Sequence, residues 1–275
     1  MNIQATLFKS LFIFSFSFFT CSLYAQKKKK ERKKEFYFSW GYNKEWYTKS
    51  KVKIDQPSLG NKYTFVDVIG KDHPGWNEDG GIFKKELTIP QYNYRLGLFL
   101  NKKKDLAVEI NFDHTKFIFA DQRVRIKGTL NNAPVDSLID FNKANGYYYY
   151  LNNGANFLLF NIVKRWHLYK NNAGTFKVDA LGKVGIGPVI PHVENSFFGN
   201  TNTPHFQIGG WNTGVEAALR TTFFDYVYLE FSNKADYARY ADLKIFEGTA
   251  KHAFGTYEMI LSLGVNFPVG SKVKN

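Results

Sequence analysis

Residues 257–267 read YEMILSLGVNF and alternate apolar side chains with mostly small or polar ones. One face of an extended chain would carry Tyr257, Met259, Leu261, Leu263, Val265 and Phe267, and the other Glu258, Ser262, Gly264 and Asn266. A period of two residues is typical of a β-strand, and about ten residues is the length of a tilted strand that crosses a bilayer. The stretch therefore predicts a membrane-spanning strand with a lipid-facing side and an interior side.

The same alternation recurs upstream and predicts eight strands in all. The others are expected within 36–43, 91–100, 108–113, 157–169, 176–186, 215–223 and 227–232. Short connections (102–105, 170–174 and 225) alternate with long ones (49–87, 120–156, 189–206 and 236–251). Short periplasmic turns and long outer loops are typical of outer-membrane barrels. We therefore expect an all-β fold, an eight-stranded antiparallel up-and-down transmembrane β-barrel over 36–268 with both termini periplasmic. A soluble sandwich, the alternative, needs no such regular alternation.

The composition and the N-terminus indicate an exported chain. Aromatic residues make up 18%, yet the mean hydropathy is -0.35, a pairing that suits a barrel with aromatic girdles and a polar lumen. Residues 1–25 resemble a signal peptide, with Lys9 before the apolar run 11–19 and small residues before Gln26. An uncleaved helix and a lipoprotein anchored at Cys21 are the alternatives. Loss of Cys21 with the signal would leave no thiol chemistry.

The chain carries a formal net charge of +13, part of it in the run KKKKERKKE at 27–35. We expect residues 26–35 to form a basic periplasmic tail, either simply solvated or in contact with anionic headgroups. Residues 269–275 form the expected C-terminal tail. The predicted partners are outer-membrane lipids, lipopolysaccharide and the barrel-assembly machinery. Nucleic acid is not expected for an exported chain.

The interior row of the expected barrel is charged. It contains Arg95, Glu109, Glu216, Arg220, Glu230 and Glu258. A barrel of eight strands is filled by its side chains, and buried charges of opposite sign should pair. This predicts a plugged lumen and a non-enzymatic protein that serves envelope structure or surface recognition. A narrow pore, or a path for protons or small ions, is the alternative use of the same row.

His114 is the main candidate for chemistry. By register, His114 and Lys116 continue the lipid-facing row near the outer rim, where both would bind lipid headgroups. Asp113 and His73 are the other catalytic candidates. A deacylase-like hydrolase of lipid A or phospholipid, the alternative function, needs a hydroxyl where Lys116 stands, and Thr115 points inward. His192, His205 and His252 could converge at the outer end, but no His or carboxylate spacing matches a metal template. We expect no metal and no cofactor.

Three stretches resemble, in order, a family of largely uncharacterised exported outer-membrane barrel proteins. They are VEINFDHTKFIFADQRVRIKG (108–128), GKVGIGPVIPHVENSFFG (182–199) and YADLKIFEGTAKHAFGTYEMILSLGVNF (240–267). The family's Asp-His-x-Lys-aromatic motif is matched by Asp113, His114, Lys116 and Phe117. Its His-x-Asp-Gly-Leu-Asn element would correspond to Leu151–Asn156, which lacks both His and Asp. The resemblance implies the barrel fold and no established activity, and an inactive chain if the missing residues are catalytic.

Overall fold

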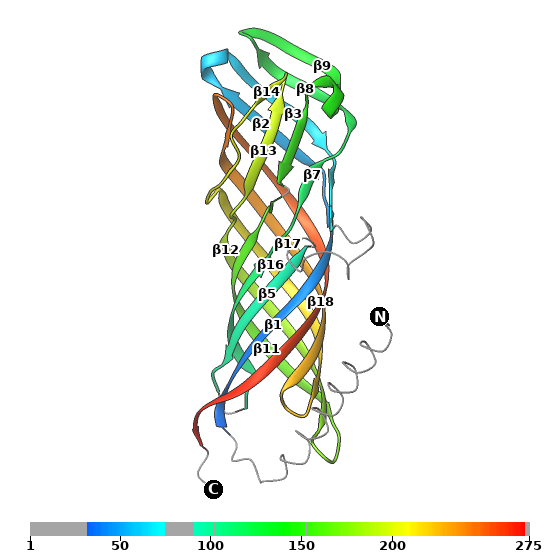
Figure 1. Cartoon of the computed structure of the whole chain (residues 1–275), viewed down its shortest axis with the longest axis vertical. Helices are drawn as coiled ribbons and strands as arrows, with labels where there is room; N and C mark the ends of the chain where they lie inside the picture. The colour runs from blue at the N-terminus through cyan, green and yellow to red at the C-terminus, as the bar shows by residue number, and fades with distance from the viewer. Residues whose placement is uncertain (1–31, 75–90, 102, 152, 273–275) are drawn as a thin grey trace, which may run out of the picture.

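The chain is almost entirely antiparallel β-structure. The computed structural model describes residues 32–74, 91–101, 103–151 and 153–272. Its long strands are β1 (Arg32–Tyr47), β5 (Tyr92–Phe99), β6 (Leu106–Asp113), β11 (Phe157–Lys170), β12 (Phe176–Pro188), β16 (Gly210–Phe223), β17 (Val227–Ile245) and β18 (Gly248–Lys272). Each pairs antiparallel with the next in this order, and β1 also pairs with β18, so the order of pairings returns to its first strand (Figure 1). The predicted all-β antiparallel fold is confirmed.

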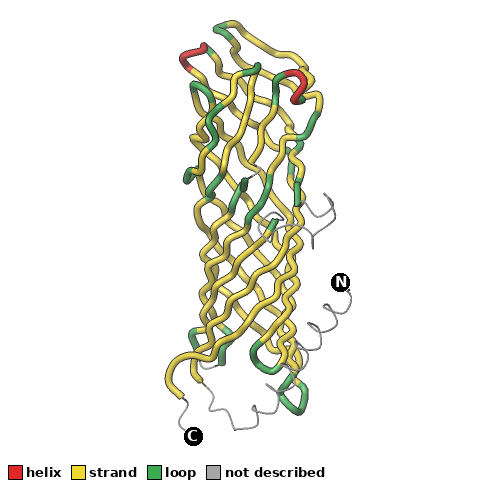
Figure 2. Tube along the Cα trace, in the orientation of Figure 1, coloured by secondary structure: helices red, strands yellow, loops and turns green. Residues whose placement is uncertain are grey.

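The described residues contain no helix that is long and apolar enough to cross a membrane. The helical content that they do contain is two short 3-10 turns, η2 (Pro57–Leu59) and η3 (Lys143–Asn145). Figure 2 shows these turns at the upper end of a molecule that otherwise consists of strands.

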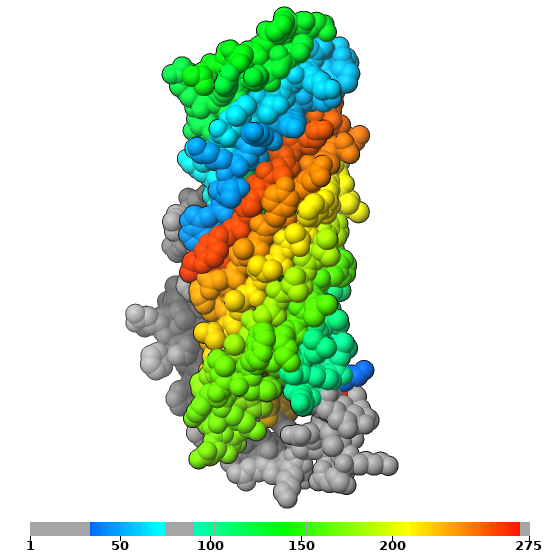
Figure 3. Space-filling model, turned by 180° about the vertical axis from the view of Figure 1, so that it is seen from behind, coloured from blue at the N-terminus to red at the C-terminus, as the bar shows by residue number. Residues whose placement is uncertain are grey.

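Further strands stand above the long ones. The main sheet continues from β18 through β2 (Ser50–Gln56), β3 (Asn61–Val68), β8 (Gln122–Leu130) and β9 (Ala133–Phe141). A second sheet contains β4 (Gly70–Lys71), β7 (Phe117–Phe119), β10 (Tyr148–Leu151), β13 (His192–Phe197) and β14 (Asn200–Thr201), and β15 (His205–Phe206) pairs with β13. From behind, β18 runs obliquely upward beside β2, with β8 and β9 at the top (Figure 3). We call these strands, together with the ends of β17 and β18 that pair with them, the upper part.

The upper part corrects the prediction of four long loops. Segments 49–87, 120–156 and 189–206 each contain strands where the structure describes them, and 236–251 is the continuation of β17 and β18 through a turn at Phe246 and Glu247. The physical reason is visible in the sequence. Val52 and Ile54 alternate with lysines, and this period of two builds a strand whose outer face meets water rather than lipid. The β8–β9 hairpin turns at Asn131 and Asn132, with φ of 50° and 63°, as tight hairpin turns require.

The outer surface of the long strands is apolar. Its exposed side chains include Leu96, Val108, Ile110, Phe160, Ile162, Val184, Ile186, Val215, Leu219, Leu229, Leu261 and Leu263. Aromatic pairs bound this belt at two levels. Tyr92–Tyr94, Trp46–Tyr257 and Trp211–Tyr237 lie toward the upper part, and Phe36–Phe267 and Phe176–Phe223 lie at the end with the short turns. An exposed apolar belt between aromatic girdles is typical of transmembrane β-barrels.

The interior is filled in layers. In the lower half, an apolar cluster contains Tyr37, Phe99, Ala107, Val163, Leu181, Ala218 and Tyr228. A larger, aromatic-rich core fills the upper part, with Tyr63, Phe65, Phe117, Phe119, Phe141, Phe197 and Phe254 among its members. Charged side chains occupy the space between the two clusters.

Both ends of the described chain lie beside the short turns, at the lower end of Figure 1. β1 begins at Arg32 and β18 ends at Lys272, so the strands extend into both segments expected as tails, 26–35 and 269–275. The expected signal peptide, 1–25, lies outside the described residues.

Candidate functional site: the polar interior and the rim at His114

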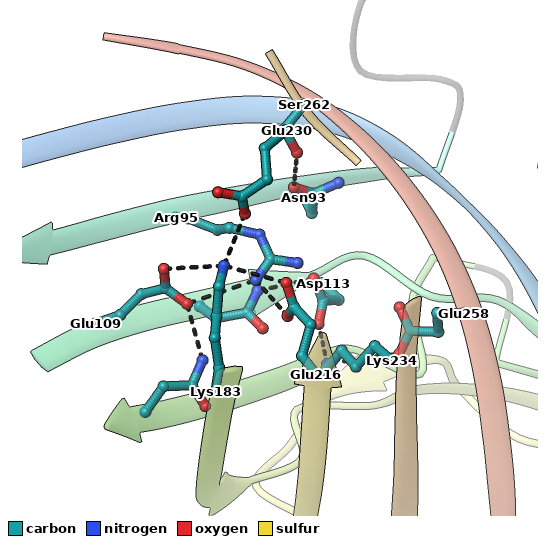
Figure 4. A network of polar contacts seen from close by, with 12 residues as sticks. Asn93, Arg95, Glu109, Asp113, Lys183, Glu216, Glu230, Lys234, Glu258 and Ser262 are labelled. Atoms are coloured by element: carbon teal, nitrogen blue, oxygen red, sulfur yellow. Dashed lines mark hydrogen bonds and ion pairs between the residues drawn. The ribbon is translucent and has the colours of Figure 1, made fainter. Parts of the chain in front are cut away.

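A compact ion-pair network lies inside the long strands, and we call it the central network (Figure 4). Arg95 Nη1 lies 2.7 Å from Glu216 Oε2 and 3.5 Å from Glu109 Oε1. Lys183 Nζ lies 2.8–3.3 Å from the carboxylates of Glu109, Glu216 and Glu230. Arg220 Nε donates to Glu230 Oε2 at 2.6 Å. The three cations therefore balance the three carboxylates, as buried charges must.

Neutral side chains add hydrogen bonds to the central network. Tyr37 donates its hydroxyl to Glu109 Oε2 at 2.7 Å, and Asn161 donates to Glu109 Oε1 at 2.9 Å. The guanidinium of Arg220 lies 4.5 Å from the ring centroid of Tyr37 and 4.0 Å from that of Tyr228. Stacking of a desolvated guanidinium on two rings is worth roughly 2 kcal/mol or more. The network is thus held both by charge and by packing.

A second cluster lies nearer the upper part and is dominated by carboxyl groups. Lys234 Nζ lies 2.5 Å from Asp113 Oδ2, 2.8 Å from Asp236 Oδ2 and 3.5 Å from Glu258 Oε1. Asn43 donates to Glu45 Oε1 at 2.8 Å and to Glu258 Oε2 at 3.4 Å, so a fourth buried carboxyl group is linked to the cluster. We call this the Lys234 cluster. In contrast to the central network, it has one ammonium group among several carboxyl groups.

The structure buries all six predicted interior residues and divides them between two clusters. Arg95, Glu109, Glu216, Arg220 and Glu230 belong to the central network, whereas Glu258 belongs to the Lys234 cluster. The sequence prediction left out Lys183 and Lys234. Alternation places Lys183 on an inward row opposite apolar residues. Lys234 lies between the predicted strand 227–232 and the predicted long connection 236–251, so the inward row of that strand stops short of it.

His114 lies immediately after the end of β6, at the rim between the long strands and the upper part. Its Nδ1 lies 2.8 Å from Asn156 Oδ1, and its ring stacks on Tyr92 at 4.7 Å between centroids. Burial lowers the pKa of His114 to about 4, against a smaller raising effect of Asn156. At neutral pH the imidazole is therefore uncharged, it is a weak base, and its partner is an amide rather than a hydroxyl.

Lys116 does not take the position that alternation predicts. It is 7% exposed, and its carbonyl accepts a 2.6 Å hydrogen bond from Tyr47. The reason is that β6 ends at Asp113, so the period of two stops before Lys116 and no longer directs its side chain outward. Lys116 is therefore not on an exposed lipid-facing row as predicted, and its binding of lipid headgroups stays a prediction. Thr115 is buried, in agreement with its predicted inward direction.

Of the remaining histidines, His192 and His205 lie on the paired strands β13 and β15. Asp113, the second catalytic candidate, is ion-paired to Lys234, and His73 follows Asp72, whose carboxylate accepts from the Glu45 amide at 2.9 Å. Over the described ranges, no group of three or more His, Cys, Asp or Glu side chains could hold a metal ion.

His252 is buried in the aromatic core of the upper part. Its Nδ1 lies 3.3 Å from Ser50 Oγ, its Nε2 lies 3.2 Å from the Tyr149 hydroxyl, and its ring stacks on Tyr240. Burial lowers the pKa of His252 to about 3. It is thus a neutral core side chain, and the expected convergence of histidines does not include it.

Comparison with known proteins gives structural neighbours alone. No family model matches the chain, and no curated protein matches it, so the family resemblance stays a prediction. The structural neighbours are outer-membrane β-barrel proteins. They include the N-terminal barrel domain of Pseudomonas aeruginosa OprF (9% identity, 86% of this chain, 99% of that chain, TM-score 0.35). Yersinia pestis Ail, solved with a heparin analogue, has 15% identity, with 86% of this chain and 99% of that chain covered and a TM-score of 0.33. The Escherichia coli outer membrane protease OmpT has 9% identity, with 89% of this chain and 100% of that chain covered and a TM-score of 0.34. Such low values support no assignment of function.

Proposed function

We propose that this chain is an integral outer-membrane protein, an eight-stranded transmembrane β-barrel that is plugged and non-enzymatic and that presents its upper part outside the cell for recognition. One observation carries the proposal: apolar side chains face outward along the long strands while charged ones face inward. Leu261 is 59% exposed, whereas Arg95 and Arg220 are fully buried. Only a protein surrounded by lipid gains from that inversion.

The pairing of β1 with β18 supports a closed barrel. Hydrocarbon cannot satisfy the free N–H and C=O groups of a sheet edge, so a sheet in lipid must close. Residues 34–47 of β1 pair with β18, and residues 35–42 pair with β5, so β1 has a partner on each side. With β5, β6, β11, β12, β16 and β17 this makes eight strands.

The filled interior supports a structural rather than a conducting barrel. An ion crossing it would have to displace Arg95, Lys183 and their carboxylates, and then pass the aromatic-rich core of the upper part. Breaking a buried ion pair costs several kcal/mol, so a thermal opening is rare. The upper part, which has its own core, is then the surface available to a partner.

The location follows from the same features. In this proposal the short turns and both termini face the periplasm, residues 1–25 are removed as an export signal, and the barrel-assembly machinery inserts the mature chain. Outer-membrane lipids surround the apolar belt, and lipopolysaccharide contacts the upper girdle around Trp46 and Tyr257. These aromatic side chains pair at 5.8 Å between centroids, an arrangement suited to a lipid–water interface.

The hydrolase alternative is not supported by the geometry of His114, because its hydrogen-bond partner is Asn156 and its imidazole is a weak base.

Three measurements test the proposal together. Purified protein should migrate differently on gels before and after heating, give no discrete conductance in planar bilayers where an open porin conducts, and leave lipid A and phospholipid acylation unchanged in deletion and His114→Ala strains. Discrete channels would refute the proposal that the barrel is non-conducting. An altered acylation pattern in both strains would refute the proposal that the protein is non-enzymatic.

A further inference from the structure

A cavity of about 280 Å³ lies at the lower end of the interior, among the short turns. Its lining comes from β1, β11, β12, β16, β18 and the connecting turns. Its charged members are Glu35, Lys103, Lys104, Arg165, Lys170, Lys177, Asp179 and Asp225, and His167 also lines it. The volume is near the lower limit of small-ligand sites. We call it the lower cavity.

Arg165 gives the lower cavity a fixed positive wall. It is 5% exposed, its Nε donates to the Lys104 carbonyl at 2.7 Å, and its Nη1 donates to Glu35 Oε1 at 3.0 Å. Its guanidinium also lies 3.8 Å from the ring centroid of Phe99. A guanidinium held on three sides is pre-organised, so little side-chain entropy is lost when it meets a ligand.

Positive charge exceeds negative charge around the lower cavity. Glu35 is paired with Arg165 and Lys104, Asp179 lies 2.6 Å from His167, and Asp225 is paired with Lys177. Within the described part of the chain, the exposed Lys103 and Lys170 have no carboxylate partner. Two lysines are therefore left to meet an anion.

An unpartnered hydroxyl also faces the lower cavity. Thr222 is 4% exposed and lines the cavity, yet its Oγ1 has no hydrogen-bond partner. A buried polar atom without a partner costs roughly 1–3 kcal/mol, so a ligand that supplied partners here would remove that cost.

The lower cavity ends inside the barrel and does not lead into a channel. Val163 lies between Asn161 and Arg165 on β11, and Leu181 lies between Asp179 and Lys183 on β12. Both belong to the apolar cluster that separates the lower cavity from the central network. A ligand that enters from below would therefore stop at Arg165.

We propose that the lower cavity binds a phosphate-bearing anion. A rigid guanidinium, unpaired ammonium groups and a hydroxyl donor are the groups that recognise phosphate oxygens. The phosphate could belong to a soluble solute or to the headgroup of a phospholipid in the adjoining leaflet. Binding itself does not depend on the membrane orientation proposed above, because the site is built within the barrel.

The test is isothermal titration of the full barrel, folded in neutral detergent, with inorganic pyrophosphate. Lys103→Gln with Lys170→Gln is the site variant, Thr222→Val removes the hydroxyl at nearly constant volume, and Lys53→Gln with Lys127→Gln is the matched control on the upper part. We expect one saturable site that binds at least about tenfold more weakly in the double site variant and also more weakly in Thr222→Val. The control should match the parent protein.

Absence of saturable binding, or an equal loss in the control, would overturn the proposal, since the latter would indicate diffuse attraction to a basic protein. The titration repeated in nanodiscs then identifies the source of the phosphate. Weaker pyrophosphate binding in phosphatidylglycerol discs than in phosphatidylcholine discs would show competition by a headgroup. Equal binding in the two would assign the site to a soluble phosphate. Heat-modifiable migration of every sample checks the barrel independently.

Discussion

Arg95 on β5 and Glu216 on β16 meet across the interior at 2.7 Å, and neither side chain is more than 2% exposed. Removing the guanidinium of Arg95 takes a positive charge away from the buried carboxylates of Glu216 and Glu109. We expect Arg95→Met to lower the free energy of unfolding by about 3–5 kcal/mol, the usual effect of breaking a buried pair. Urea unfolding in lipid vesicles, followed by tryptophan fluorescence, measures this loss.

The matched control for Arg95→Met is Arg125→Met, because Arg125 is paired with Asp136 at 2.6 Å but is half exposed. Surface pairs contribute about 0–1 kcal/mol, so this variant should unfold almost like the parent protein. Adding Glu216→Gln to Arg95→Met should recover part of the stability. Equal effects of the two arginine variants would contradict the role given to the central network.

Leu261 and Leu138 are both 59% exposed and offer a direct test of the lipid-facing belt. Leu261→Arg places a charge on the belt and should cost about 2–4 kcal/mol near the bilayer midplane, with less folded barrel recovered from vesicles. Leu138→Arg changes a side chain of β9 in the upper part and should be nearly neutral. If both variants assemble equally well, the belt does not face lipid.

The proposed orientation can be read with single cysteines, because the chain's one cysteine, Cys21, lies in the expected signal. Ser137 on β9 and Ala173 in a short turn are both exposed. Ser137→Cys should react with a membrane-impermeant maleimide on intact cells. Ala173→Cys should react only after the outer membrane is permeabilised. The reverse labelling pattern would show that the orientation in the membrane is opposite to the proposed one.

His252 should make the upper part sensitive to acid. Its pKa is about 3 in the folded protein and about 6.5 in an unfolded chain. Between these values the unfolded state binds the extra proton, so this contribution to stability is complete above about pH 6.5 and falls by up to about 1.4 kcal/mol per pH unit below it. Hydrogen exchange of β18 near His252 measures the effect. His252→Phe should remove this part of the pH dependence, and an unchanged slope would exclude His252 as its source.

The strands of the belt were predictable because their outward and inward faces have different surroundings. In the proposed membrane setting, lipid outside and a packed polar interior impose alternation on residues 257–267 and on the seven other segments, and that pattern is visible in a single sequence. The strands of the upper part alternate as well, as in Val52 and Ile54 of β2. Their outer face meets water and carries lysine, so they resemble ordinary hydrophilic loops in composition.

Which charges pair was less predictable than which charges point inward. Alternation fixes the inward rows of β17 and β18, but the distance between Lys234 and Glu258 depends on strand stagger and rotamers, which no local pattern encodes. The end of β6 at Asp113 is a similar case. The loss of alternation after Asp113 was enough to bury Lys116.

The pairing of β2 with β18 has a consequence for the biogenesis of the protein. Lys53, Ile54 and Asp55 of β2 hydrogen-bond with residues 249–251 of the last strand, and β3, β8 and β9 join the sheet through β2. A segment that lies late in the chain is therefore the pairing partner of segments that lie much earlier. In the main sheet, β2, β3, β8 and β9 are joined to the long strands through this contact. In an exported chain they would gain this partner only after the hairpin of β17 and β18 has arrived, and until then periplasmic holding chaperones would have a defined stretch to protect.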